Sequence, residues 1–210
     1  LLFLMAFSLL ITLFPEPITK LLAWGWDSEL IGKTAPMTAI NFWYLDLIFI
    51  VTFLATLLQY KNHFATTAMS TALLNISMIA ALYIYMKDDP KTVAYALSFA
   101  VLIGGGLQVV AHLLTLNNLK LHKILIGGWK YRKNKDVEAE KKHFQSLFLP
   151  GILGNSTPQI SAFIDTLLAT FLTTGSVSYL FYANRVFQLP LAIIAIATAT
   201  VLFPAVSKAL

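Results

Sequence analysis

The sequence predicts an all-α integral membrane protein, an antiparallel bundle of about six transmembrane helices. Hydrophobic residues make up 58% of the 210-residue chain and charged residues only 12%, and the mean hydropathy is +0.73. Soluble domains average about half apolar and a quarter charged residues. The shortage of charge is the stronger signal, because a surface that faces water needs charged side chains. No segment shows the alternating pattern of a β-strand.

Apolar runs follow one another along the chain. A helix needs about 20 apolar residues to cross roughly 30 Å of hydrocarbon. The predicted spans are 1–14, 37–60, 64–86, 92–116, 144–172 and 177–206. Turn residues or charges separate them, in PEP, YKNH, KDDPK, a long polar stretch and TTGS. The first run has no basic region before it, so we expect a truncated helix rather than a signal peptide, within an internal portion of a longer transporter-like chain.

Basic residues fall unevenly on alternating connections. Four lie on one set of connections: Lys20, Lys33, Lys87 and Lys91. Ten lie on the other: Lys61, Lys120, Lys123, Lys130, Arg132, Lys133, Lys135, Lys141, Lys142 and Lys208. Because cytoplasmic loops are enriched in Lys and Arg, we expect the second set to be cytoplasmic. The chain then divides into four helices (1–116, the first truncated), a basic cytoplasmic loop (117–143) and a helix hairpin (144–210).

The basic loop has two interpretations. It is either a nucleic-acid patch or a segment lying on the anionic leaflet, with Leu119, Ile124, Leu125 and Trp129 among its lysines. Acidic residues interrupt the charge and zinc-ligand spacing is lacking, so we expect membrane lipids and no nucleic acid as partners. With no cysteine and with four scattered histidines (His63, His112, His122, His143), no metal or cofactor is expected.

A run of three glycines, 104–106, lies inside a predicted span. It does not follow a strand, which excludes a phosphate-binding loop. Glycine in membrane helices lets neighbouring helices approach closely, so we expect a packing notch, with a hinge as the alternative.

Three ionisable residues fall inside predicted spans: Asp46, Asp165 and Arg185. Each costs at least about 2.5 kcal/mol at the bilayer centre unless it faces protein or water. Asp46 lies about two turns into its helix, where we expect a structural role, either reaching towards water or capping a neighbour.

Asp165 and Arg185 lie on either side of Gly175, each ten residues away. If the chain turns near this glycine, both residues lie about 15 Å along their helices, near the bilayer midplane. Two interpretations are open. They form a buried ion pair that holds the hairpin together, or Arg185 binds an anionic group, since its planar fork matches phosphate oxygens.

The surroundings favour the second interpretation. Pro190 and Pro158 interrupt the two predicted helices, as at the substrate sites of transporters, and are candidate hinges. Uncharged hydrogen-bonding residues add to the proposed substrate-binding set of Arg185 and Asp165; these are Asn184, Gln188, Gln159 and Ser161, with Asn155, Ser156 and Thr157 nearby. We therefore expect a helix pair that lines a polar cavity.

Three segments carry a family resemblance: GSVSYLFYANRVFQLPLAIIAIATATVLFPAVSK, PGILGNSTPQISAFIDTLLATFL and FATTAMSTALLNISMIAAL. They resemble the MurJ (MviN) lipid II flippases of the MOP exporter superfamily, in the same order and over most of the chain. The resemblance implies that the six spans correspond to the third to eighth of about fourteen helices, with residues 1–116 in the N-terminal lobe. It also implies that Arg185 is the eighth-helix arginine of a cationic cavity. The chain departs from the family at Ala192, Ala195 and Ala199, where relatives often have glycine, and at Gln188, where some carry an acid.

The family resemblance implies a function in the bacterial cytoplasmic membrane. Members move lipid II, a lipid-linked peptidoglycan precursor, from the inner to the outer leaflet by alternating access. It implies a transporter rather than an enzyme, without a cofactor, and leaves open ion coupling, membrane potential and contact with the peptidoglycan synthesis machinery. The alternative is another transporter of the superfamily, either a polysaccharide-precursor flippase or an ion-coupled drug exporter. A membrane enzyme would need a nucleophile or an acid–histidine cluster, and a scaffold would use Arg185 only for folding.

Overall fold

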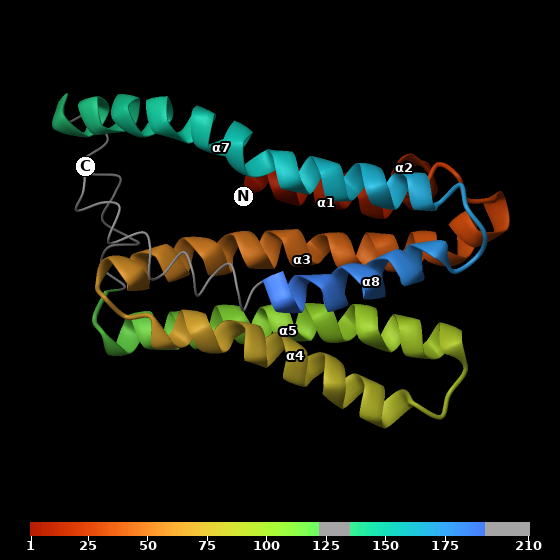
Figure 1. Cartoon of the computed structure of the whole chain (residues 1–210). Helices are drawn as coiled ribbons and strands as arrows, with labels where there is room; N and C mark the ends of the chain where they lie inside the picture. Colours follow the sequence, from red (N-terminus) through yellow and green to blue (C-terminus); the bar gives the residue numbers. More distant parts are fainter. Residues whose placement is uncertain (122–134, 192–210) are drawn as a thin grey trace. The chain divides into compact units, whose positions relative to one another are not determined.

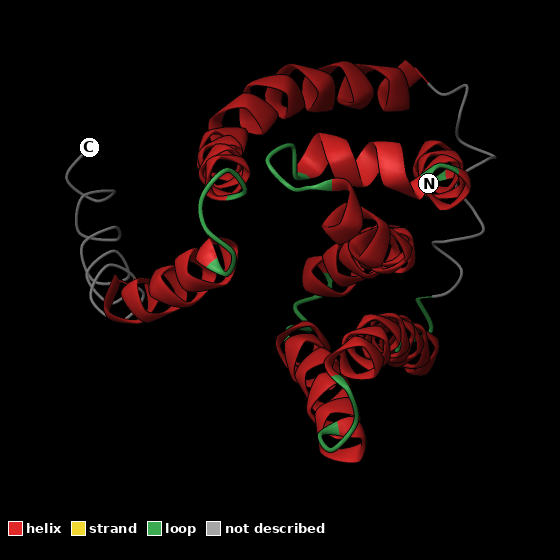
Figure 2. Ribbon diagram, turned by 90° about the vertical axis from the view of Figure 1, so that its right-hand side faces the viewer, coloured by secondary structure: helices red, strands yellow, loops and turns green. Residues whose placement is uncertain are grey.

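The computed structural model describes residues 1–121 and 135–191, which are mostly α-helical (Figures 1 and 2). The helices are α1 (Leu2–Leu13), α2 (Pro15–Leu22), α3 (Ser28–Tyr60), α4 (Ala65–Tyr85), α5 (Pro90–Asn118), α7 (Lys135–Ala169) and α8 (Ser176–Leu191). They belong to two compact units. The first contains Leu1–Leu21 and Ser28–Gly151, and the second contains Leu22–Asp27 and the described residues from Ile152 onwards.

Three of the described helices, α3, α4 and α5, are each long and apolar enough to cross a membrane. A fourth candidate span is the pair α1 and α2, which bends by 101° at the break between them. The predicted helical membrane bundle is therefore confirmed, with three or four candidate spans among the described residues. The polar residues of α7 lower its hydropathy, and half of the predicted span 177–206 lies beyond the described part of α8.

The break at PEP was only partly predicted. The chain does leave α1 after Leu13, but Pro15 and Pro17 then lie in the first turn of a further helix, α2. This is a position that proline tolerates, because the first backbone N–H groups of a helix have no partner within it. The break predicted at PEP is therefore a bend of 101° between two helices, α1 and α2, rather than a loop.

The first unit is built around α5, which packs against both α3 and α4, while α1 packs against α3. Leu54 and Leu58 of α3 form a small buried cluster with Leu116 of α5. Polar contacts add to the packing: Asn41 Nδ2 donates to Ser98 Oγ at 3.2 Å, and Gln108 Nε2 donates to the Ser70 carbonyl at 2.7 Å. Interhelical hydrogen bonds of this kind are usual in membrane bundles, where lipid removes the hydrophobic drive for helix association.

The glycine run of α5 forms the predicted notch. A Cβ atom at Gly104 would lie 3.0 Å from the Leu74 Cα of α4, and one at Gly105 would lie 2.9 Å from side-chain atoms of Leu47 and Tyr44 on α3. A Cβ at Gly106 would meet nothing within 4 Å. The packing interpretation is thus confirmed for two of the three glycines. Gly104 allows the close approach of α4 to α5, and Gly105 allows the close approach of α3.

The connection between α4 and α5 ends in a helix cap. Asp89 is the N-cap of α5, where its carboxylate accepts hydrogen bonds from the Thr92 backbone N–H at 3.0 Å and the Thr92 hydroxyl at 2.7 Å, and Pro90 follows in the first turn. These two bonds favour the charged form and lower the pKa of Asp89 from its ordinary value of 3.8.

The Asp89 cap predicts a pH dependence of stability. Because the folded-state pKa is lowered, the contribution of Asp89 is present at neutral pH and is lost as the pH falls below 3.8 through the folded value. In thermal unfolding, Asp89→Asn is expected to keep the cap but to show a weaker loss of stability at acid pH than the unmodified protein. Asp89→Ala should be less stable at neutral pH. Identical acid sensitivity of the Asn variant and the parent would contradict this role.

In the second unit, α7 and α8 are joined by residues 170–175, and Gly175 adopts the left-handed conformation with φ of 97°. A glycine is favoured there because it lacks a Cβ atom. The segment 22–27 contacts this link, since the Gly25 backbone N–H donates to Thr170 Oγ1 at 3.0 Å. A Cβ at Gly25 would lie 2.4 Å from the Thr170 carbonyl oxygen, so only glycine fits this position in its present conformation.

Candidate functional site

The candidate site begins with Arg185, which lies in the middle of α8 and is exposed. Its guanidinium carbon lies 5.1 Å from the ring centroid of Phe181, a distance at which a cation is attracted to the ring face. Gln188 is three residues after Arg185 and Phe181 is four before it, so the three lie on one face of the helix. Asn184 and Gln188 are exposed as well.

The α7 members of the predicted set are also exposed. Ser161 and Asp165 are one helical turn apart and share a face, and Gln159 lies shortly before them. Nearby hydroxyl groups bond to their own helix, as Ser156 Oγ does to the Ile152 carbonyl at 2.6 Å. Such bonds leave these hydroxyls less available to a ligand.

Asp165 and Arg185 do not form the ion pair that was one of the two interpretations. No ion pair joins these residues in the part of the chain that the structure describes, and both are exposed. Figure 1 shows α8 returning after the link, but α7 and α8 are not among the helix pairs in close contact along their described lengths. The guanidinium of Arg185 is therefore not neutralised by Asp165, and that is the condition for binding an anion.

The two candidate hinges lie inside helices. Pro158 does not interrupt α7, which continues from Lys135 to Ala169, so the expected break is absent there. Pro190 is the penultimate described residue of α8, and Ala192, Ala195 and Ala199 lie outside the described residues. Most of the predicted interfacial stretch, including Ile124, Leu125 and Trp129, also lies outside them.

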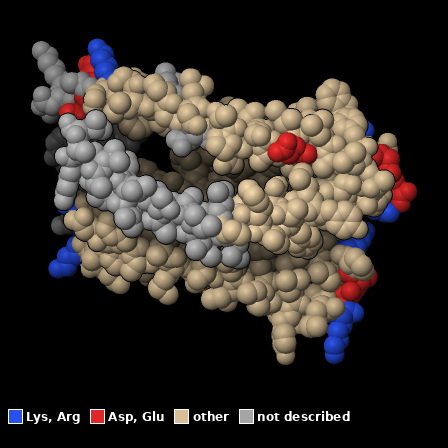
Figure 3. Space-filling model, viewed as in Figure 1, with Lys and Arg blue, Asp and Glu red and all other residues tan. Residues whose placement is uncertain are grey.

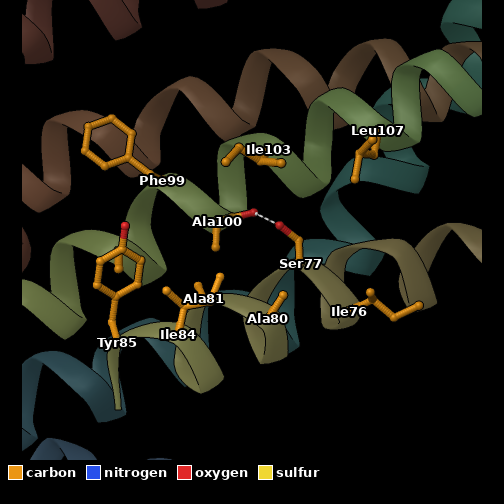
Figure 4. A pocket seen from close by; sticks show the side chains of 11 residues that line it. Ile76, Ser77, Ala80, Ala81, Ile84, Tyr85, Phe99, Ala100, Ile103 and Leu107 are labelled. Carbon is orange, nitrogen blue, oxygen red and sulfur yellow. Dashed lines mark hydrogen bonds between the residues drawn. The ribbon is translucent and has the colours of Figure 1, made fainter. Parts of the chain in front are cut away.

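Two pockets lie between helices of the first unit. One, of about 600 Å³, is an apolar groove between α4 and α5, where Ile84, Phe99 and Ile103 surround the hydrogen bond from Ser77 Oγ to the Ala100 carbonyl (2.7 Å, Figure 4). It has no charged lining residue and suits an acyl chain rather than an anionic group.

The second pocket, of about 420 Å³, was not predicted. It lies between α3 and α4 with Gln108 of α5 in its lining, and hydroxyl groups dominate its polar part. Thr67 Oγ1 and Ser70 Oγ are buried there without a hydrogen-bond partner. Single serines and threonines give little sequence signal, because such residues usually bond to their own helix backbone. The pocket can accept water or an uncharged hydrogen-bonding group.

Charged side chains are otherwise sparse on the molecular surface. Figure 3 shows a mostly uncharged face, with the Lys, Arg, Asp and Glu side chains mainly at its left and right edges and one acidic group away from the edges. Among the described residues, no three His, Cys, Asp or Glu side chains are grouped as a metal would need. Arg185 lies in the middle of α8, whereas Lys33 and Lys91 lie near the first residues of the apolar helices α3 and α5. The chemistry that the site can perform is the binding of an anion, such as a phosphate, in an apolar setting.

Asp46, for which we expected a structural role, is buried rather than directed towards water. Only 6% of its surface is exposed, and its Oδ2 is hydrogen-bonded to the Ser8 hydroxyl of α1 at 2.7 Å. The prediction of a contact with a neighbouring helix is confirmed, whereas the alternative in which the side chain reaches water is wrong. The sequence did not indicate that α1 would be the partner.

Comparison with known proteins agrees with these features. The family model described as "Lipid II flippase MurJ" matches residues 1–210. The "Probable lipid II flippase MurJ" of Helicobacter pylori strain ATCC 700392 / 26695 is 48% identical over 213 residues, and that of strain J99 is 47% identical. In Burkholderia cenocepacia, the "Lipid II flippase MurJ" is 29% identical over 184 residues.

The two Helicobacter alignments cover 96% of the chain but 46% of each relative, and the Burkholderia alignment covers 87% of the chain and 35% of that relative, so the chain spans about half or less of the length of the curated relatives it matches. The match extends over every described helix and confirms a transporter family rather than an enzyme family. Together with the candidate spans, it makes the chain a multi-pass protein of a bacterial membrane. The match to the family model over the whole of residues 1–210 leads to one conclusion: the chain belongs to the MurJ lipid II flippase family.

Proposed function

We propose that this chain forms part of a transporter that moves lipid II from the inner to the outer leaflet of the bacterial cytoplasmic membrane by alternating access. The family assignment and the names of the relatives support this substrate. The observation that carries the proposal is the state of Arg185: its guanidinium is exposed on an apolar helix and has no ion-pair partner among the described residues. A cation in this setting is costly unless it meets water or an anion.

In the proposed mechanism, Arg185 binds the pyrophosphate of the lipid. Its two-point geometry fits two phosphate oxygens, and its delocalised charge is weakly hydrated, which lowers the cost of leaving water. The Phe181 ring supports the guanidinium from the preceding turn. Gln188, on the same face, donates a further hydrogen bond, and Ser161 and Gln159 of α7 bind uncharged parts of the head group.

A transport assay tests this function. Cells depleted of their own lipid II flippase are supplied with the full-length protein, and the lipid II exposed on the outer leaflet is quantified by its accessibility to an externally added enzyme. Restored exposure and growth are expected. If lipid II stays in the inner leaflet although the protein is present in the membrane, the substrate assignment is wrong, and the alternatives are tested with a polysaccharide precursor and a cationic drug.

A further inference from the structure

The carboxyl group of Asp46 lies between two apolar helices and has few hydrogen bonds. Asp46 of α3 is 6% exposed and Ser8 of α1 is 1% exposed. The Oδ2 atom of Asp46 lies 2.7 Å from Ser8 Oγ, which lies 3.3 Å from the carbonyl oxygen of Phe42. The other carboxyl oxygen, Oδ1, is buried and has no hydrogen-bond partner.

The number of protons in this chain of oxygens indicates the state of the acid. Asp46 Oδ2, Ser8 Oγ and the Phe42 carbonyl make two contacts, which are two separate hydrogen bonds when each has its own proton. A serine hydroxyl supplies one proton and a carbonyl supplies none. With Asp46 ionised, the single Ser8 proton is shared between the two acceptors; with Asp46 protonated, both contacts are full hydrogen bonds, because Asp46 donates to Ser8 and Ser8 donates to Phe42. The Phe42 contact is long, so the state of Oδ1 is the stronger indication.

An ionised carboxylate would have one hydrogen bond for two charged oxygens, both removed from water. Buried charges are normally paired and fully hydrogen-bonded, because the loss of hydration is otherwise uncompensated. In the protonated acid, Oδ1 is a neutral carbonyl oxygen, for which a missing partner costs much less.

Neighbouring groups do not supply a counter-charge. Helix α1 carries no ionisable side chain, and its Thr12 hydroxyl donates to the Ser8 carbonyl while accepting from Trp43 Nε1. On α3, the Tyr44 hydroxyl contacts Gln108 of α5. The ionisable side chains of α5 are Lys91, Tyr95 and His112; His112 Nδ1 contacts the Gln108 carbonyl, and no described cation forms an ion pair with Asp46.

We propose that Asp46 is a membrane-embedded proton-binding site at the interface of α1 and α3, and that it is protonated in this arrangement of the helices. Loss of the proton leaves a buried carboxylate with one donor, so the proton leaves only when the interface opens to water. The site thereby links proton binding to the packing of α1 on α3. This inference is independent of the transported substrate, since it rests on contacts within the first unit.

Infrared spectroscopy of the full-length protein in lipid vesicles tests the proposal. At neutral pH the protein is expected to show the carbonyl-stretch band of a protonated carboxylic acid, which shifts in D₂O and is missing in Asp46→Asn. The Asn variant resembles the protonated acid in shape and charge. Asp88→Asn, which removes an exposed acid between α4 and α5, is the matched control and should keep the band.

Two further measurements keep the result interpretable. If Asp46→Asn fails to insert, two results with other proteins must still be seen. Labelling of the parent protein with ¹³C-aspartate must shift the carbonyl-stretch band. Ser8→Ala must also displace this band, because the protonated acid then loses the Ser8 hydroxyl as its hydrogen-bond acceptor. The proposal is overturned if Asp46→Asn instead removes a carboxylate band at neutral pH. It is also overturned if sodium chloride, compared with choline chloride, raises the thermal stability of the parent but not of Asp46→Asn, which would indicate a sodium site.

Discussion

Arg185→Ala is expected to leave the full-length protein inserted in the membrane while abolishing lipid II transport. Arg185 has no ion-pair partner among the described residues, so its removal leaves no unpaired acid behind. A charged hydrogen bond contributes about 1.5–3 kcal/mol, and its loss should weaken substrate binding by about 10- to 150-fold. Complementation of a flippase-depleted strain measures transport, and the amount of protein in the membrane fraction measures insertion.

Two related variants separate substrate binding from folding. Arg185→Lys keeps the charge but loses the two-point fork, so an intermediate loss of transport is expected. Asp165→Asn should have a smaller effect than Arg185→Ala, because Asp165 makes no ion pair with Arg185. Full complementation by Arg185→Ala would refute the binding role. An equal fall in membrane insertion and transport would show instead that Arg185 serves the fold.

Gly104→Ala is expected to destabilise the protein, whereas Gly106→Ala is expected to be neutral or slightly stabilising. The added methyl group at position 104 would lie 3.0 Å from the Leu74 Cα, a backbone atom that moves only if α4 shifts. Overpacking of this kind costs about 1–3 kcal/mol. The same change at position 106 meets open space and removes the conformational freedom of a helical glycine.

The comparison of these neighbouring positions is internally controlled, because both substitutions add one methyl group to the same helix. Thermal unfolding of the purified full-length protein in detergent provides the measurement. Gly105→Ala should fall between them, since its close neighbours are side-chain atoms of Leu47 and Tyr44 that can move. Equal stabilities of the 104 and 106 variants would show that α4 and α5 are not held at the close approach described here.

Much of the fold could be predicted because each span is a local property of the chain. The predicted spans 64–86 and 92–116 correspond closely to α4 and α5, since turn residues and charges end the helices there. Prediction was weaker where polar residues extend a helix into water: α3 begins at Ser28 rather than near residue 37, and α7 begins at Lys135 rather than near 144. Such turns are helical but not apolar, so hydropathy does not reveal them.

The candidate site was predicted from residue type and spacing, through one arginine in an apolar helix and its polar neighbours. Its role in lipid II transport stays a prediction. The unpartnered hydroxyls of Thr67 and Ser70 could not be predicted, because nothing in their spacing shows which helical hydroxyls bond to their own backbone.

The amino-acid sequence alone determined the helical membrane class, because a segment crosses a bilayer only if it is long and apolar enough for the hydrocarbon thickness, and both properties are local to the segment. It also determined that Arg185 lies within an apolar helix. The tertiary structure alone decided that Gly104 faces α4 while Gly106 faces open space, and that Ser8 of α1 meets Asp46 of α3. These pairings depend on how each helix is rotated about its axis, which follows from the packing of all the helices together.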